Sequence, residues 1–458
     1  MSKDIAIITE NDEYISYNSL AKRMRKFNEN IKSERSLIII MASNTLGSVI
    51  GYFSCLKYKN VPIMLRDNLE CEQLEKYMSD YRVNYVWLPE KWLDSDGVVL
   101  NERYETVYSE YGYVLLSISG QKVCLNSELA LLLTTSGTIR SSKLVRLSYQ
   151  NIVSNTRAIC KYLAINENDR AVTSLPMSYT YGLSVINTHL YSRATVLLTD
   201  RQIYTSEFWE YFKNNKGTSF SGVPYMYEML IKLGMFNEDI ATLKVMTSAG
   251  GKLSINDEKH LLKYAQEYAK KLIVMYGQTE ATARISYRPY EDMKRKIGSI
   301  GIAIPEGNMW LENQQGDIIN KPYNNGEIIY KGKNVSMGYA YDYTDLVKGN
   351  TNKGVLHTGD IGYIDEDGYF YILDRCDESI NVNGNRLALR YMEKMLEEMY
   401  PDVEVKCMSE KCYDEYMDKK IKICIKPKKK MYIDKMEIVS FIKNNTGINL
   451  GAISVIVG

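Results

Sequence analysis

Short runs of apolar residues, bounded by glycine, serine or asparagine, alternate in the first part of the chain with segments whose apolar residues recur at helical spacing. The runs predict buried strands, and the segments between them predict helices. The run Leu129–Thr134 is apolar on both faces, as in a central parallel strand covered by helices. The pattern therefore predicts an α/β fold for roughly the first 370 residues. Other strands are predicted at Leu37–Met41, Ala194–Thr199, Val245–Ser248 and Leu272–Tyr276.

The pattern changes over the last third of the chain, where short strands separated by turn residues become dominant. Residues Asp365–Gly368 have the composition of a hairpin turn. A helix is expected near Leu389–Met399, followed by a lysine-rich pair of strands within Lys406–Lys428. We therefore expect a large domain over residues 1–374 and a small α+β domain over residues 375–458.

One uncharged stretch, Ser36–Leu56, is long enough to cross a bilayer. Its polar interruption, Ser43–Thr45, instead favours a strand, a turn and a helix. We expect no membrane span, with a spanning helix as the alternative.

The charge of the chain is balanced, with 57 basic and 56 acidic residues and a net charge of +1. This balance argues against a protein that neutralises nucleic-acid phosphates over its whole surface. The basic run Lys426–Lys430 follows a predicted strand, where lysines are typical of a solvated edge. Phosphate binding by this run stays open as the alternative.

Cysteine and histidine are arranged unlike a metal or disulfide framework. The eight cysteines form no CxxC pair, and the chain has three histidines. The first residues carry acids where a signal peptide needs an apolar run. We therefore expect free thiols and a cytoplasmic location.

The segment Ala130–Asn151 has the most informative chemistry, because a buried strand leads into hydroxyl residues, one glycine and a lysine. Backbone amides, hydroxyls and a mobile cation are the groups that wrap a polyphosphate. The spacing is not that of a Walker A loop, and a plain turn is the alternative. The candidate residues are Thr135, Ser136, Gly137, Thr138 and Lys143.

A second segment runs an apolar strand into Tyr276, Gly277, Thr279 and Glu280. An aromatic ring can stack on a base, a hydroxyl can bind a phosphate, and one carboxylate can hold Mg²⁺, which takes few protein ligands. Taken alone, this is also an ordinary strand end.

A third segment places Asp360 after a glycine and Arg375 at the end of the following hairpin. The carboxylate suits two sugar hydroxyls, and the guanidinium suits a phosphate or a ribose. This pair alone is weak evidence for a nucleotide site.

In this order and at these separations, the three segments together resemble the adenylate-forming superfamily, which contains acyl-CoA synthetases, peptide-synthetase adenylation domains and luciferase-like enzymes. The resemblance covers nearly the whole chain. Further matching segments are Leu175–Leu183, Ser221–Pro224, Ser248–Gly251, Gly298–Gly301 and Gly332–Tyr339.

The resemblance implies a large domain of parallel-rich sheets with covering helices and a β-barrel-like subdomain, followed by a small mobile domain. It places Thr135–Thr138 and Lys143 over the β- and γ-phosphates of ATP. Thr279 would contact the α-phosphate, and Glu280 would carry the magnesium ion. Catalysis would depend most on Thr138, Lys143 and Glu280.

The resemblance also implies how the rest of the substrate binds. Tyr276 and Gly277 would lie at adenine, with the backbone of Gly250 and Gly251 close to the ring. The remaining assignments are Asp360 and Arg375 at the ribose, Tyr179 and Gly182 in the acid pocket, and Asp377 at the hinge between domains.

Some residues depart from the family pattern. The phosphate loop has Ile139 and Arg140 where Thr-Gly is usual, and Ser142 where proline precedes the lysine. The terminal Ser-Gly-Lys motif has no counterpart before Gly458. We therefore expect that the chain is truncated, that it adenylates slowly, or that another group replaces the lysine.

These features predict an acid-thiol ligase that uses ATP and Mg²⁺ to form an acyl-adenylate, releases pyrophosphate, and transfers the acyl group to CoA or a carrier-protein phosphopantetheine. The pocket segment Leu175–Leu183 contains no acid to hold an α-ammonium, which favours a carboxylic acid over an amino acid. The room left by Gly277 favours an acid larger than acetate. The alternatives are a degenerate member that binds without turnover and an amino-acid-activating protein. An NAD-type dehydrogenase is disfavoured because no early strand precedes a GxGxxG motif.

Overall fold

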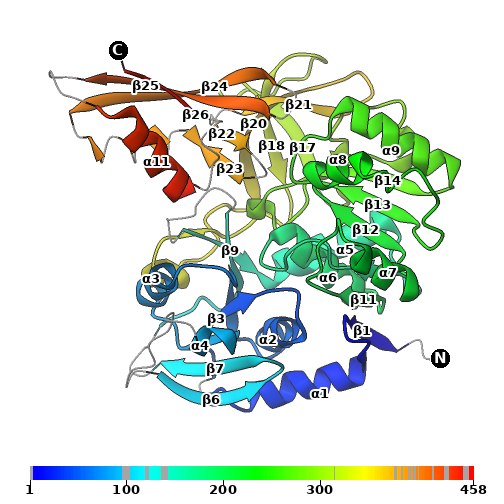
Figure 1. Cartoon of the computed structure of the whole chain (residues 1–458), viewed down its shortest axis with the longest axis vertical. Helices are drawn as coiled ribbons and strands as arrows, with labels where there is room; N and C mark the ends of the chain where they lie inside the picture. The colour runs from blue at the N-terminus through cyan, green and yellow to red at the C-terminus, as the bar shows by residue number, and fades with distance from the viewer. Residues whose placement is uncertain are drawn as a thin grey trace.

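Two large sheets organise the first 340 residues of the computed structural model (Figure 1). The structure describes residues 4–32, 34–94, 104–118, 123–135, 143–313, 315–375, 379–382, 385–389, 392–393, 396, 399–400, 402–414, 417–427, 433–446 and 453–457.

The first sheet has nine strands, and its central members are parallel. Its order is β16 (Ile302–Ala303), β15 (Ser286–Tyr287), β14 (Lys271–Tyr276), β13 (Val245–Ser248), β12 (Ser219–Gly222), β10 (Arg170–Val172), β11 (Thr195–Leu198), β1 (Ile5–Thr9) and β2 (Tyr14–Ser16).

The second sheet has eight strands, of which β8, β4, β3 and β5 are parallel neighbours. Its order is β19 (Gly338–Ala340), β9 (Leu144–Ser148), β8 (Leu129–Thr134), β4 (Val61–Arg66), β3 (Leu37–Ala42), β5 (Tyr85–Pro89), β7 (Tyr113–Ile118) and β6 (Tyr104–Glu110).

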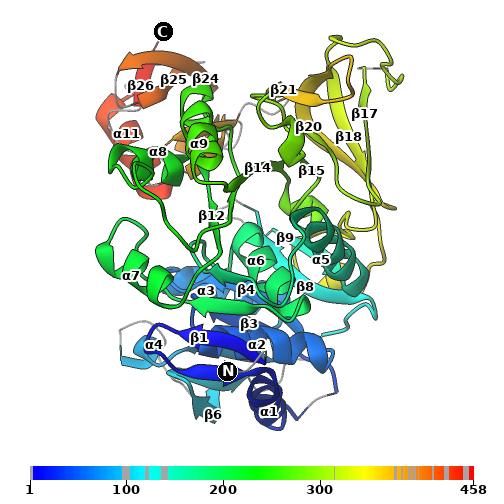
Figure 2. The ribbon, with the colours of Figure 1, turned by 90° about the vertical axis from the view of Figure 1, so that its right-hand side faces the viewer.

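Helices pack between and outside these sheets, as Figure 2 shows from the side. Among them, α5 packs on β8 and β9 of the second sheet, α6 packs on β10 and β11 of the first, and the two helices contact each other. The helices are α1 (Tyr17–Asn28), α2 (Leu46–Lys57), α3 (Cys71–Tyr81), α4 (Lys91–Asp94), α5 (Tyr149–Leu163), α6 (Thr180–Tyr191), α7 (Ser206–Asn214), α8 (Pro224–Lys232), α9 (Ile255–Glu267) and α11 (Lys435–Thr446), with short 3-10 helices η1 (Thr279–Ala281), η2 (Tyr290–Asp292) and η3 (Tyr343–Val347).

One hydrophobic core joins the two sheets. Val196 from the first sheet, Leu131 from the second and Leu183 from α6 belong to the same buried cluster. Because burial of apolar side chains is the main favourable contribution to folding, this shared core fixes the two sheets relative to each other. The predicted α/β class is confirmed.

The uncharged stretch from residue 36 to residue 56 folds as β3, a turn and α2, as the sequence predicts. In the part of the chain that the structure describes, no helix combines the length and the apolar character needed to cross a bilayer.

An antiparallel sheet of four strands follows the first large sheet, in the order β17 (Asn308–Glu312), β18 (Gly326–Lys331), β20 (Val355–Ile364) and β21 (Phe370–Arg375). The predicted hairpin turn lies between β20 and β21. This sheet occupies the part of the chain in which we expected the β-barrel-like subdomain.

The last part of the chain contains a two-stranded and a three-stranded sheet packed with α11. The strands are β22 (Ser379–Val382), β23 (Asn385–Ala388), β24 (Val403–Asp414), β25 (Met417–Pro427) and β26 (Ile453–Val457).

This part has its own hydrophobic cluster, which includes Leu389, Ile423 and Ile438. Contrary to the expectation of an edge strand, β25 pairs with β24 on one side and with β26 on the other. A parallel pairing between strands that are separated by α11 has no local signature in the sequence. A domain boundary after residue 374 stays a prediction.

Candidate active site

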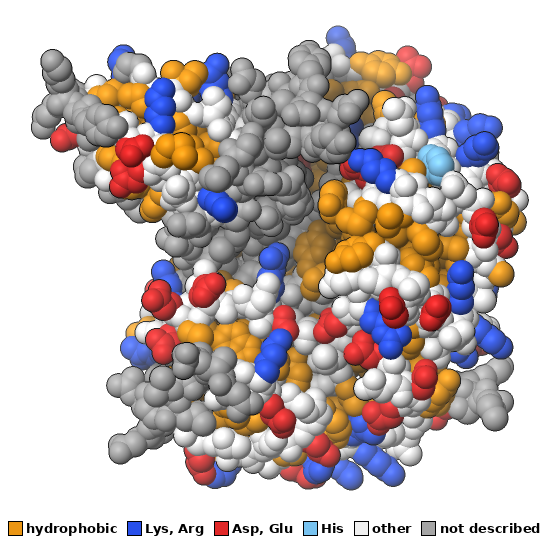
Figure 3. Space-filling model, viewed as in Figure 1, with side chains coloured by type: hydrophobic (Ala, Val, Ile, Leu, Met, Phe, Trp, Pro, Cys, Tyr) orange, Lys and Arg blue, Asp and Glu red, His pale blue; other side chains and the backbone are white. Residues whose placement is uncertain are grey.

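Three adjacent parallel strands end together at one edge of the first sheet. Gly222 at the end of β12 is in register with Ser248 at the end of β13, which is in register with Val274 of β14. The segments that follow these strands therefore emerge side by side, and ligands of open α/β sheets bind at this edge. Hydrophobic side chains gather over the region of α8, the helix that follows β12 (Figure 3).

Gly250 follows β13 at a position where a larger residue does not fit. Its φ is +84°, and a Cβ atom there would lie 2.6 Å from the hydroxyl of Tyr179. An L-residue would be strained by this φ, and the hydroxyl leaves no space for a side chain. The neighbouring Gly251 would bring a Cβ to 3.3 Å from Pro224. The pair of glycines thus exposes backbone beside Tyr179, as an approaching planar ring requires.

Two other predicted glycines are explained by backbone packing. A Cβ on Gly277 would lie 1.9 Å from the carbonyl oxygen of Ala283, and a Cβ on Gly182 would lie 2.3 Å from the carbonyl oxygen of Pro176. The expectation that Gly277 leaves room for a larger acid is therefore wrong, because the chain itself fills that space.

Asp360 lies at the end of β14 although it belongs to β20. Asp360 is 2% exposed, and its carboxylate accepts hydrogen bonds from the hydroxyl of Tyr276 and, at 2.8 Å, from Nε2 of Gln278. The amide of Gln278 also donates to the carbonyl oxygen of Thr358 at 2.8 Å. Gln278 thereby links β20, which contains Asp360, to the end of β14. Sequence reasoning missed this role.

Arg375 is the register partner of Asp360 on the neighbouring strand β21. The structure describes the backbone of Arg375, and its side chain lies outside the described set. The two residues predicted to share the ribose therefore stand opposite each other in one hairpin.

Glu280 lies in η1, directly after the end of β14. Its Oε1 accepts a hydrogen bond of 2.8 Å from the hydroxyl of Tyr339. The Nζ of Lys143 lies over the same tyrosine ring, 3.6 Å from its centroid. The predicted magnesium carboxylate and the predicted phosphate lysine are therefore joined through Tyr339, which sequence reasoning did not single out.

The segment from residue 332 to residue 337 holds this turn in place. Ser336 N donates to the carbonyl oxygen of Glu280 at 2.8 Å. The buried amide of Asn334 donates to the carbonyl oxygens of Ala281 and Arg284, each at 2.9 Å. These bonds satisfy the polar groups of a buried turn and orient the glutamate toward Tyr339.

The acid pocket predicted at Tyr179 lies against aromatic side chains. Tyr179 and Tyr181 are in edge contact, with ring centroids 6.4 Å apart. Burial raises the pKa of both hydroxyls, and the nearby charge of Arg284 opposes this rise. Tyr181 is 1% exposed, and its hydroxyl is 2.8 Å from the hydroxyl oxygen of Thr247 of β13, so that its ring is fixed against this strand.

Several predicted residues cannot be compared with the structure. Ser136, Gly137, Thr138 and Asp377 lie outside the described residues, whereas Thr135 is described directly after β8. That Thr138 lies with Glu280 and Asp360 around one nucleotide therefore stays a prediction.

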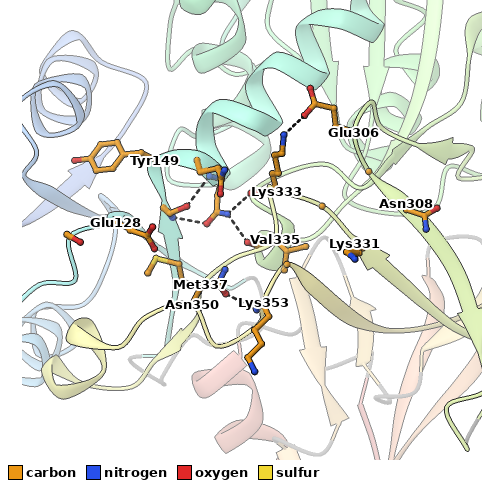
Figure 4. Close-up of a pocket in the computed structure, with 17 residues that line it drawn as sticks. Glu128, Tyr149, Glu306, Asn308, Lys331, Lys333, Val335, Met337, Asn350 and Lys353 are labelled. Carbon is orange, nitrogen blue, oxygen red and sulfur yellow. Dashed lines mark hydrogen bonds and ion pairs between the residues drawn. The ribbon is translucent and has the colours of Figure 1, made fainter.

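A cavity of about 880 Å³ lies next to this site (Figure 4). The start of α5 lines it, together with the basic side chains of Lys331, Lys333 and Lys353. One segment contacts both the cavity and the site: Lys333 lines the cavity, whereas the next residue, Asn334, donates a hydrogen bond to the turn that contains Glu280. Glu280, Tyr276 and Asp360 are not among its lining residues in the described part of the chain.

The donor set fits a magnesium ion that arrives with a nucleotide. Within the described ranges, no three His, Cys, Asp or Glu side chains gather as a metal site. Mg²⁺ bound through one carboxylate, substrate phosphates and water needs no such cluster. Glu280 supplies one carboxylate at the strand end.

Comparisons with known proteins agree on the family. A family profile described as AMP-binding enzyme matches residues 2–340. The chain is 27% identical over 321 residues to an oxalate–CoA ligase of Arabidopsis thaliana, covering 69% of this chain and 61% of that protein. It is 28% identical over 264 residues to a 2-succinylbenzoate–CoA ligase of Bacillus cereus, covering 57% of this chain and 53% of that protein.

Solved structures share the fold over the whole chain. A double mutant of o-succinylbenzoate CoA synthetase from Bacillus subtilis, bound to a product analogue, has a TM-score of 0.78 at 21% identity, covering 99% of this chain and 92% of that one. The same synthetase has been solved with ATP and magnesium ion, with a TM-score of 0.67 at 21% identity, covering 99% and 93% of the two chains. The sequence matches to the two curated relatives above span between half and two thirds of their length.

Proposed function

This chain belongs to the AMP-binding enzyme family, and we propose on that basis that it is an acid-thiol ligase. It activates a small carboxylic acid with ATP and then transfers the acyl group to the thiol of CoA or of a carrier-protein phosphopantetheine. The resemblance seen in the sequence is confirmed at the level of the family.

The observation that carries the proposal is the convergence of Asp360 and Glu280 at the end of β14. Asp360 accepts hydrogen bonds from Tyr276 and Gln278, and Glu280 lies two residues after Gln278 in the chain. The carboxylate that we propose for the ribose, the ring that we propose for adenine and the carboxylate that we propose for magnesium thus lie along one strand end. These are groups of the kinds that the ribose, the base and the magnesium-bound phosphates of one nucleotide need.

The chemistry that fits this arrangement is adenylation. A carboxylate oxygen of the acid attacks the α-phosphorus of ATP, the bond to the β-phosphate oxygen breaks, and pyrophosphate leaves with its electron pair. The thiol then attacks the acyl carbon, loses its proton to solvent, and releases AMP. No general base is needed in the first step, because the nucleophile is already an anion.

The protein's part in the first step is positioning and neutralisation of charge. Magnesium supplies a positive charge to the leaving pyrophosphate when it is bound with ATP. Glu280 would hold that ion, Thr279 would contact the α-phosphate, and Lys143 with the loop Thr135–Thr138 would cover the outer phosphates. Tyr276 would stack on adenine beside Gly250.

Four further expectations remain proposals. The acid would lie at Tyr179 and Gly182, and Asp377 would be the hinge of a small mobile domain after residue 374. A carrier protein is one source of the acceptor thiol. The protein would act in the cytoplasm, since free thiols suit a reducing compartment.

The test is acid-dependent release of pyrophosphate, or hydroxamate formation with hydroxylamine, across a panel of carboxylic acids. Glu280→Gln should lower Mg²⁺-dependent turnover by about 10²- to 10³-fold, because one preorganised charge on the leaving group is lost. Glu228→Gln is the matched control, since this glutamate pairs with Lys232 at the surface. Wild-type activity in Glu280→Gln would contradict the assigned role.

Calorimetry with ATP separates the ligase from a member that only binds. Tight binding of ATP without AMP formation, with every acid tested, would favour the binding protein. Release of pyrophosphate with an amino acid alone would favour the amino-acid-activating alternative.

A further inference from the structure

Arg284 is a buried arginine in contact with Tyr181, next to the residues that we propose for the acid site. It follows the turn that contains Glu280, and the residue is 3% exposed. Its carbonyl oxygen accepts hydrogen bonds from the amide groups of Asn155 at 3.0 Å and Asn334 at 2.9 Å. The backbone position of this arginine is therefore well determined.

The partners of its guanidinium group are neutral. Nε donates to the sulfur of Met275 at 3.4 Å, and Nη1 donates to the carbonyl oxygen of Ala283 at 3.2 Å. Cζ lies 3.9 Å from the ring centroid of Tyr181. Among the described residues, no carboxylate lies within 4.0 Å of its nitrogens, so that the charge has a π face, the hydroxyl of Tyr162 and weak acceptors as its neighbours.

Arg288, four residues further along, shows what a structural arginine looks like in the same protein. It is 0% exposed, and its Nη2 lies 2.6 Å from Oε1 of the buried Glu258. Burial of a charge is costly unless an opposite charge lies close to it. Arg288 has such a charge, and Arg284 lacks one in the described part of the chain.

Arg284 lies close to Tyr181, Tyr179 and Tyr162. Tyr181 and Met275 belong to an apolar cluster with Ala249, which lies between β13 and Gly250. Tyr179 covers this cluster and reaches Gly250 with its hydroxyl. The charge of Arg284 also counteracts the burial that raises the pKa of Tyr162. Three tyrosines thus surround one cation.

We propose that Arg284 binds a second carboxylate on the acid, so that the enzyme activates dicarboxylic acids in preference to monocarboxylic acids. This inference rests on the proposed function. An arginine presents paired N–H groups that match both oxygens of a carboxylate, and a ligand carboxylate would supply the counter-charge that the described residues do not. The tyrosine rings would accommodate the carbon chain between the two acid groups, and the other carboxylate would face the α-phosphate.

The experiment compares acids of equal carbon number, namely succinate with butyrate, glutarate with pentanoate, adipate with hexanoate, and phthalate with 2-methylbenzoate. The readout is kcat/KM for pyrophosphate release. We expect at least one dicarboxylic acid to exceed its monocarboxylic partner by about tenfold or more in the wild-type protein, since a hydrogen-bonded charge pair is gained. Arg284→Met should lower kcat/KM for the preferred dicarboxylic acid until it no longer exceeds that of its monocarboxylic partner.

Arg284→Lys and Arg295→Met complete the set. Lysine keeps the charge but loses the paired geometry, and we expect it to keep part of the preference. Arg295 is an arginine whose side chain is 58% exposed and pairs with Asp292, so that its substitution should change neither rate nor preference. If Arg284→Met does not fold, the wild-type ratios and the lysine variant still decide the matter.

Equal use of the two acids of every pair by the wild-type protein would overturn the inference and leave the ligase intact. An unchanged ratio in folded Arg284→Met would do the same. Calorimetry of the dicarboxylic acids in the presence of AMP gives an independent readout. Binding that Arg284→Met weakens by about tenfold, without pyrophosphate release from any acid, would support Arg284 and reject the ligase.

Discussion

The hydroxyl of Tyr339 donates a hydrogen bond of 2.8 Å to Oε1 of Glu280. Tyr339 belongs to β19, an edge strand of the second sheet, and Glu280 follows β14 of the first sheet. This bond therefore joins the two sheets at the proposed phosphate site. Because Lys143 also contacts the ring of Tyr339, one tyrosine positions two charged groups.

Tyr339→Phe should weaken the use of magnesium. The substitution removes the hydrogen bond that orients the carboxylate, whereas the ring under Lys143 stays. We expect kcat/KM for pyrophosphate release to fall about 10- to 100-fold, with a higher Mg²⁺ concentration needed for half-maximal rate. Tyr341→Phe is the control, since that side chain is 59% exposed. An unaltered Mg²⁺ dependence would remove Tyr339 from the positioning of Glu280.

Glu258→Gln should strongly destabilise the fold. The substitution leaves the buried guanidinium of Arg288 without its counter-charge, which costs about 3–5 kcal/mol. Denaturant unfolding followed by circular dichroism measures the loss. Glu228→Gln breaks a surface ion pair with Lys232 and should cost less than about 1 kcal/mol. Similar losses in the two variants would show that the buried pair is no more important than the exposed one.

Gly277→Ala should damage the end of β14. A Cβ at this position would lie 1.9 Å from the carbonyl oxygen of Ala283, so that the backbone of the turn must move. We expect a loss of about 2 kcal/mol or more in the free energy of unfolding, together with lower ATP affinity. Gly349→Ala is the control, because a Cβ there meets nothing within 4 Å. A stable variant with wild-type ATP binding would refute the close backbone contact.

His189 should make the protein less stable in acid. Burial lowers the pKa of this histidine below its ordinary value of 6.5, and the carbonyl oxygen of Val185 counteracts part of that effect. The folded state therefore keeps the ring neutral while the unfolded state takes up a proton. The stability contribution is present above pH 6.5 and is lost as the pH falls toward the folded pKa, by up to about 1.4 kcal/mol per pH unit.

The check is the free energy of unfolding between pH 7.5 and pH 5.5, compared between the wild-type protein and two variants. His189→Gln should flatten the dependence on pH, whatever its effect on stability at neutral pH. His260→Gln should leave the dependence unchanged, since His260 is exposed. Identical slopes for the wild-type protein and His189→Gln would contradict a buried neutral histidine.

The sequence by itself predicted the strands that carry the chemistry. Leu129–Thr134 and Val245–Ser248 are strands with the predicted bounds, because continuous apolar runs between turn residues are a local signal. The order of the motifs that contain Thr279 and Asp360 also predicted the family, because each motif consists of residues that are neighbours in the sequence. The role of each residue at the bound nucleotide stays a prediction.

Only the tertiary structure decided which of these residues meet, and what each glycine and charge is for. Gln278 bonds to Asp360 across 82 positions of the chain, and Tyr339 bonds to Glu280 across 59. A Cβ on Gly277 would collide with the carbonyl oxygen of Ala283, and among the described residues Arg284 has no carboxylate partner, unlike Arg288. Such facts depend on the packing of distant strands, because contact distance and burial arise when sheets close on one another and have no period in the sequence.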